Sequence, residues 1–197
     1  MSNTLFLFII GVIVVQRLVE SYLPNWKKVK GIKLAKWTWI AFSITYPLLI
    51  FGSVGEYFLI SRRINLWISG IGLGIVAVRI WLKWWAMLTL GEYWSVQIEV
   101  RELHKLVKDG PYRYLRHPAY LSNLMEYLGV PLIANAYYTL IGVLLVYLPL
   151  NLIRLYLEEK ELIRKFGKEY EDYRKEVPAL LPIRTQSWFQ QKDKLFS

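Results

Sequence analysis

Long apolar stretches constrain the fold of this chain more than any other feature. A helix needs roughly 20 consecutive, mostly apolar residues to cross the hydrocarbon core of a bilayer. Such stretches occupy about 4–23, 37–60, 66–90, 118–134 and 137–155. Hydrophobic residues make up 55% of the sequence, which exceeds the roughly 45–50% typical of soluble domains. We therefore predict an all-α integral membrane protein with about five transmembrane helices, a cytoplasmic connector and a C-terminal amphipathic helix, forming a single membrane domain over 1–197.

The distribution of charge predicts the orientation of these helices. The formal net charge is +10, and the loop after the first stretch carries Lys27, Lys28, Lys30, Lys33 and Lys36 without an acid. Cytoplasmic loops are enriched in Lys and Arg, so five spans place the N-terminus outside and the connector and C-terminus in the cytoplasm. Basic residues beside apolar stretches indicate contact with lipid headgroups, and not with nucleic acid. No basic region or cleavage site marks a removable signal peptide, so the first span is expected to be retained. No obligate protein partner is inferred.

The connector before the fourth stretch is polar, basic and rich in turn residues. It contains both histidines of the chain, His104 and His117, together with Arg113 and Arg116. Pro118 suits the first position of a helix, where its missing N–H costs no intrahelical bond. The imidazoles are either hydrogen-bonded structural groups or part of a ligand pocket. Because the chain has no cysteine and only two histidines, we expect no metal site.

Charged residues at or inside the apolar stretches leave further alternatives open. From Asn151 to about Lys175 the apolar spacing becomes amphipathic and helical. Arg154 and Glu158 lie one helical turn apart there. They form either an ordinary salt bridge at the membrane edge or a site in which Arg154 holds a carboxylate. Arg79 and Glu126 lie within expected spans, where ionisable groups either serve a function or pair with other side chains.

A series of short motifs covers about residues 90–182. In chain order the motif residues are Gln97; His104, Leu106 and Val107; Gly110, Pro111 and Tyr112; Arg116, His117, Pro118 and Tyr120; Arg154, Glu158, Glu159 and Leu162; Phe166, Gly167, Tyr170 and Tyr173; and Val177, Pro178, Leu181 and Pro182. In this order, behind membrane spans, they resemble the isoprenylcysteine carboxyl methyltransferase family, in its short prokaryotic form.

The resemblance implies a membrane methyltransferase that uses S-adenosylmethionine and acts on a lipophilic acceptor, in the first place a carboxylate. It implies a cytoplasmic cofactor site built from 91–120 and 151–182. Arg154 is implied as the contact to the acceptor carboxylate, with Glu158 as the second catalytic residue. The implied cofactor contacts are Gln97, His104, Lys105, Leu106, Val107, Tyr112, His117, Pro118, Ala119, Tyr120 and Glu158. Alternatives are a phospholipid or alkylated-phenol methyltransferase, a sterol-reductase-like NADPH enzyme, and a non-catalytic scaffold that binds anionic lipid.

Overall fold

The computed structural model describes residues 1–22, 32–34, 36–60, 63–95, 98–100 and 106–181. The α-helices are α1 (Asn3–Tyr22), α2 (Lys36–Leu59), α3 (Leu66–Leu90), α4 (Pro118–Ala134), α5 (Tyr137–Gly142), α6 (Leu148–Phe166) and α7 (Lys168–Glu176). Shorter helical segments are η2 (Gly91–Tyr93), η3 (Gly110–Arg113) and the π-helical η4 (Val143–Tyr147). Two short strands, β1 (Ile32–Leu34) and β2 (Ile98–Val100), pair antiparallel with Lys33 opposite Glu99. Helices thus occupy all five apolar stretches.

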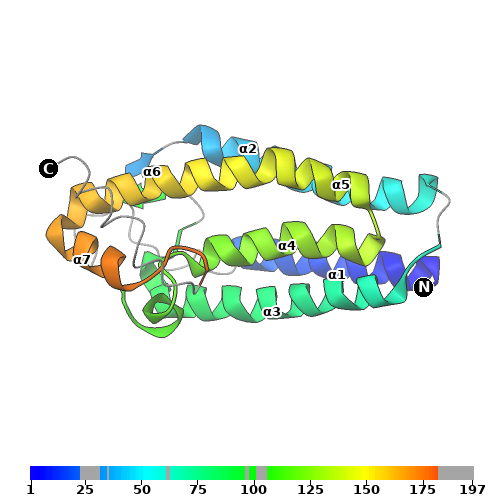
Figure 1. Cartoon of the computed structure of the whole chain (residues 1–197), viewed down its shortest axis with the longest axis horizontal. Helices are drawn as coiled ribbons and strands as arrows, with labels where there is room; N and C mark the ends of the chain where they lie inside the picture. The colour runs from blue at the N-terminus through cyan, green and yellow to red at the C-terminus, as the bar shows by residue number, and fades with distance from the viewer. Residues whose placement is uncertain (23–31, 35, 61–62, 96–97, 101–105, 182–197) are drawn as a thin grey trace, which may run out of the picture.

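The helices run side by side as a bundle, and the connector and α7 lie at the end away from the start of α1 (Figure 1). Within the described residues, four helices are long and apolar enough to cross a membrane: 3–21, 37–59, 66–93 and 137–166. The fourth expected span, α4, has 17 residues and lies among the other helices, with no residue of its own exposed. The expected all-α membrane architecture is confirmed, with α4 at its centre.

Helix α3 lies unusually close to α4 because both carry a glycine at the contact. A Cβ on Gly72 would lie 2.7 Å from the backbone nitrogen of Ile133 and 2.8 Å from the carbonyl oxygen of Gly129. A Cβ on Gly129 would in turn lie 2.7 Å from a methyl group of Val76. Small residues allow helix backbones to approach closely in a membrane, where packing has to replace the hydrophobic effect. The position of α4 therefore depends on these two glycines.

A single methyl group at this contact should destabilise the protein. We expect Gly72→Ala to lower the free energy of unfolding by about 1–3 kcal/mol, because its Cβ would meet the backbone of α4. Gly74→Ala is the matched control on the same helix, since a Cβ there meets nothing within 4 Å. Thermal unfolding of both variants in detergent measures the difference. Equal stability of the two variants would show that the helices do not approach this closely.

The link between α4 and α5 is a tight turn at Asn135 and Ala136. Asn135 adopts the left-handed conformation with φ of 54° and ends α4. Its side-chain oxygen accepts a hydrogen bond of 2.9 Å from the backbone nitrogen of Asn65, and its Nδ2 donates to Ser69 Oγ at 2.9 Å. These bonds attach the turn to the start of α3. They fix the end of the bundle that lies away from the connector.

The last membrane helix differs from expectation at its C-terminal end. It continues from Tyr137 to Phe166, passing through η4 just before Pro149. The expected amphipathic helix after residue 151 is broken at Gly167, whose φ of 53° is left-handed. Glycine adopts this conformation without steric cost. The break lets α7 turn back toward the connector instead of continuing along the axis of α6 (Figure 1).

Candidate functional site

The connector is bound to the segment after α7 by backbone hydrogen bonds. The backbone nitrogen of Arg116 donates to the carbonyl oxygen of Pro178 at 2.9 Å, and that of His117 donates to Ala179 at 3.0 Å. The guanidinium of Arg116 also donates to the carbonyl oxygens of Arg174 and Val177. Segments more than 50 residues apart in the sequence therefore form one structure at this end of the bundle.

A buried carboxylate on α6 lies at the centre of this contact. Glu159 Oε1 lies 2.6 Å from Arg116 Nη2 and 3.2 Å from His117 Nε2, and Glu159 Oε2 lies 3.5 Å from Arg174 Nε. Glu159 and His117 are both less than a tenth exposed. Removing a partner from such a group would leave a buried charge without compensation. The imidazole of His117 thus has a buried carboxylate as its partner.

Two tyrosines complete the contact between the connector and α7. The Tyr173 hydroxyl on α7 donates to the carbonyl oxygen of Tyr112 in η3. Burial raises the pKa of Tyr173 to about 12, so this phenol keeps the proton that it donates. The Tyr170 hydroxyl lies 3.4 Å from Glu159 Oε1. This hydrogen bond therefore fixes the backbone of Tyr112, whose side chain is buried, against α7.

The expected pair on α6 is bridged by a residue of α4. Arg154 Nε donates to the Tyr120 hydroxyl at 3.1 Å, and the Tyr120 hydroxyl donates to Glu158 Oε2. The Arg154 guanidinium carbon lies 5.2 Å from the ring centre of Phe42 on α2. Only 8% of Arg154 is exposed, so this arginine does not lie on a solvated face. The arrangement places a cation and a carboxylate on either side of one phenol.

The predicted site residues fall into three groups. Gln97, His104 and Lys105 lie outside the described residues. Leu106 and Val107 are half-buried beside Lys108, which pairs with Glu169 of α7 at 3.1 Å. The remaining residues come together where η3, the start of α4 and α6 meet: Tyr112, His117, Pro118, Ala119, Tyr120, Arg154 and Glu158.

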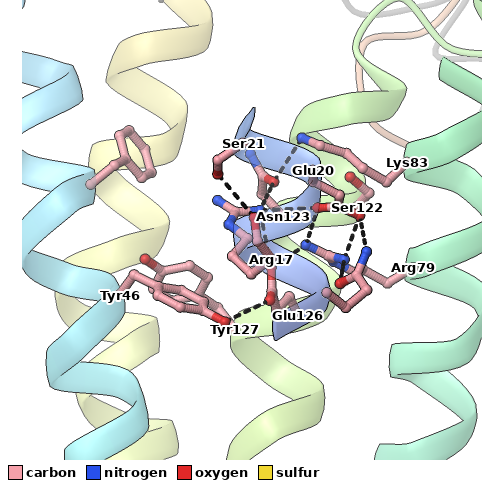
Figure 2. A network of polar contacts seen from close by, with 12 residues as sticks. Arg17, Glu20, Ser21, Tyr46, Arg79, Lys83, Ser122, Asn123, Glu126 and Tyr127 are labelled. Carbon is pink, nitrogen blue, oxygen red and sulfur yellow. Dashed lines mark hydrogen bonds and ion pairs between the residues drawn. The ribbon is translucent and has the colours of Figure 1, made fainter. Parts of the chain in front are cut away.

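A second polar cluster lies inside the bundle, as Figure 2 shows. Arg79 of α3 donates to both carboxylate oxygens of Glu20 on α1, each at 2.8 Å. The same guanidinium donates to Glu126 of α4 at 2.6 Å and to Gln16 at 2.6 Å. Arg79, Glu20 and Glu126 are each at most 3% exposed. Arg79 and Glu126, which the sequence singled out, are therefore partners of each other.

Further hydrogen bonds extend this cluster to α2 and to a second residue of α4. Arg17 of α1 donates to Glu126 at 3.1 Å and to Asn123 at 3.0 Å. Lys83 also donates to Asn123, at 3.0 Å, and Tyr46 of α2 donates to Glu126 at 3.2 Å. Buried polar groups in a membrane need partners within the protein. This network accordingly joins α1, α2, α3 and α4, and we assign it to the stability of the bundle.

Three residues of the two polar clusters, Arg17, Glu20 and Glu159, were not assigned a role from the sequence. Arg17 and Glu20 are three residues apart and face the same neighbours, a spacing that could have identified them as one polar face. Glu159 follows Glu158 directly, and nothing in the dipeptide indicates which carboxylate contacts the histidine. That distinction required the structure.

Comparison with known proteins gives consistent results. The model of the isoprenylcysteine carboxyl methyltransferase (ICMT) family matches residues 71–164. The uncharacterized protein YpbQ of Bacillus subtilis is 34% identical over 69% of this chain and 83% of its own length. Protein-S-isoprenylcysteine O-methyltransferase B of Arabidopsis thaliana is 31% identical over 70% of this chain and 74% of its own. A solved structure of the eukaryotic intramembrane Ras methyltransferase ICMT has a TM-score of 0.63 and 26% identity. It aligns with 84% of this chain and 60% of that one.

Proposed function

Because this chain belongs to the isoprenylcysteine carboxyl methyltransferase family, we propose that it methylates a carboxylate on a lipophilic molecule, with S-adenosylmethionine as the methyl donor. The protein is a multi-pass integral membrane methyltransferase. The observation that carries the proposal is the bridge from Arg154 through Tyr120 to Glu158 at the connector end of the bundle.

Arg154 is the residue suited to the acceptor. A guanidinium offers donors in a planar fork that matches a carboxylate, and it stays charged at any physiological pH. Tyr120 takes the Nε–H of Arg154, which fixes the plane of the fork. A carboxylate acceptor is already ionised near neutral pH, so no general base is needed. This requirement fits a site in which Arg154 contacts the Tyr120 phenol and the nearby carboxylates are themselves hydrogen-bonded.

The described residues also fit the charge of the donor. When bound, S-adenosylmethionine would supply a methyl group on a positively charged sulfonium; its transfer would form the O–C bond as the S–C bond breaks, with the electron pair left on sulfur. Glu158 supplies negative charge beside Tyr120, and the half-buried Leu106 and Val107 supply apolar surface from the connector. Tyr112, His117, Pro118 and Ala119 would line the donor site. Their packing against α6 and α7 orients the groups and excludes water, which is the main contribution a methyl transfer requires from a protein.

The lipophilic acceptor and the methyl donor would enter this site from different sides, the acceptor from the bilayer and the donor from the cytosol. Leu152, Ile153 and Tyr156 on α6 are exposed, so the outer face of this helix is suited to lipid and an apolar tail could enter between α2 and α6. Strand β1, which follows α1 and precedes α2 in the sequence, pairs with β2 of the connector, so Lys33 lies at the connector end of the bundle. By the positive-inside rule this end faces the cytoplasm and the N-terminus lies outside.

Binding of the demethylated donor tests the cofactor site. We expect purified protein in detergent to bind S-adenosylhomocysteine, and Glu158→Gln to weaken that binding about tenfold or more, because charge-assisted hydrogen bonds contribute roughly 1.5–3 kcal/mol. His117→Ala should also weaken it, since it removes one partner of Glu159. Arg164→Ala is the control, because this side chain on α6 is mostly exposed.

Isothermal titration calorimetry measures these affinities and separates the proposal from its rivals. Unchanged binding in both Glu158→Gln and His117→Ala would refute the cofactor site. Binding heat on titration with NADPH, but not with S-adenosylhomocysteine, would identify a reductase. Binding of neither nucleoside would favour a non-catalytic scaffold that binds lipid.

A further inference from the structure

The inward face of the last membrane helix is polar over about two turns. Counting back from Arg154, the next residues on its buried side are Asn151 and Tyr147, at steps of three and four. Their exposed fractions are 0% for Asn151 and 1% for Tyr147. Residues three and four apart share one face of a helix. The arginine proposed to hold the acceptor thus lies at one end of a buried polar row.

The two deeper members of this row have no hydrogen-bond partner in the part of the chain that the structure describes. This holds for the hydroxyl of Tyr147 and for both the nitrogen and the oxygen of the Asn151 amide. A buried polar group without a partner costs roughly 1–3 kcal/mol, and the bilayer core offers no water in compensation. An apolar residue at either position would avoid this cost. Such groups therefore point to a ligand that satisfies them.

Aromatic rings from α2 and α4 pack against the row. The ring of Tyr147 stacks on that of Tyr127, with centroids 3.4 Å apart and an angle of 11° between the planes, and is edge-on to Phe42 at 5.3 Å. Phe42 also lies under the guanidinium of Arg154, and its own side chain is half-buried. One aromatic ring on α2 therefore contacts both ends of the row.

A second, independent feature lies at the same place. The π-helical segment Val143–Tyr147 ends at Tyr147, the member of the row farthest from Arg154. Single π-helical turns inside α-helices are rare and occur frequently at functional sites. The extra residue in this turn rotates the following helix relative to α5. It thereby sets which residues from Tyr147 onward face the bundle.

We propose that Asn151 and Tyr147 recognise a hydroxyl group on the tail of the acceptor, deeper in the bilayer than the carboxylate held by Arg154. This proposal rests on the proposed function, because it takes Arg154 as the carboxylate contact. A rise of 1.5 Å per residue puts Asn151 about 4.5 Å and Tyr147 about 10.5 Å beyond Arg154 along the axis. The acceptor class is therefore a lipophilic acid with a hydroxyl a few carbons from its carboxyl group, as opposed to a plain hydrocarbon chain.

The choice of a hydroxyl follows from the groups available. The Asn151 amide supplies both a donor and an acceptor, and the Tyr147 phenol can serve as either. A ligand hydroxyl also donates one hydrogen bond and accepts others, so it can bond to both residues at once. A second charged group on the ligand has no counter-ion in the row besides Arg154. Asn151 and Tyr147 would thus determine specificity without contacting the reacting atoms.

Competition between matched acceptors tests this inference. Full-length protein in detergent is given labelled S-adenosylmethionine with hexadecanoic acid or with its 3-hydroxy, 5-hydroxy or 7-hydroxy derivative. We expect one hydroxylated acid to be preferred about tenfold in kcat/KM, the effect of one or two hydrogen bonds. Asn151→Leu should reduce this ratio to about one, and Tyr147→Phe should reduce it in part. Ile153→Leu, on the lipid-exposed face of the same helix, should retain the wild-type ratio.

Two other results would contradict the hydroxyl inference or the proposed function. Equal kcat/KM for all four acids in the wild type, or an unchanged ratio in Asn151→Leu, would overturn the hydroxyl inference and leave the proposed function standing. Methylation of none of the acids, with S-adenosylhomocysteine still bound, would overturn the carboxylate acceptor and this inference with it. Asn151→Leu removes an unsatisfied amide and should raise the thermal unfolding temperature, so loss of fold is not expected to obscure the result.

Discussion

In Arg154→Ala, kcat/KM for a lipophilic carboxylate is expected to fall about a hundredfold or more, whereas the affinity for S-adenosylhomocysteine should change by less than about threefold. Truncating one member of a buried, hydrogen-bonded charge pair typically costs 2–5 kcal/mol or more. The substitution removes the cation proposed to hold the acceptor and leaves the Tyr120–Glu158 hydrogen bond in place. Radiolabelled methyl transfer and calorimetric titration on the same preparation measure the two effects.

Two companion variants locate the effect. Tyr120→Phe removes the acceptor of the Arg154 Nε–H and should cause a smaller loss of kcat/KM, because the guanidinium charge remains. Arg164→Ala, on the exposed side of the same helix, should behave as the wild type. The opposite pattern for Arg154→Ala, weak binding of S-adenosylhomocysteine with normal turnover, would refute the assignment of Arg154 to the acceptor and Glu158 to the donor.

The largest effect on stability is expected at Arg79. Arg79→Met keeps the length of the side chain but leaves the carboxylates of Glu20 and Glu126 without their main partner. Breaking a buried ion pair by removing one member costs roughly 3–5 kcal/mol, so this variant should unfold at a much lower temperature or fail to accumulate. Lys175→Ala, which breaks a mostly exposed ion pair with Asp172, should leave the unfolding temperature nearly unchanged, because solvent screens exposed ion pairs.

A combined variant tests whether the cost comes from unpaired charge. Adding Glu20→Gln and Glu126→Gln to Arg79→Met removes the uncompensated carboxylates and should recover part of the lost stability, which a mutant cycle quantifies. Thermal unfolding in detergent gives the comparison. Additive losses in the triple variant would show that these side chains do not act as one network.

The sequence alone predicted the helices well because the membrane imposes a simple requirement. A spanning helix must be apolar over its length, and this property is local, so α1, α2 and α3 begin and end within a few residues of their expected positions. The Asn135-Ala136 turn is equally local, since the left-handed cap needs only a residue that tolerates it. The site residues Arg154, Tyr120 and Glu158 were selected through a resemblance, and in the structure Tyr120 contacts both of the others.

What only the tertiary structure decided is which polar groups meet and which do not. Neighbouring residues on a helix point about 100° apart, so Glu159 contacts His117 while Glu158 contacts Tyr120. The partners of Arg79, and the lack of a partner for Asn151 among the described residues, likewise depend on how each helix is rotated and shifted against its neighbours. Those rotations are set by contacts such as Gly72 against α4 and by the π-helical turn at Tyr147. A hydrophobic pattern fixes the length of a helix, but the pairing of its polar side chains is a property of the packed bundle.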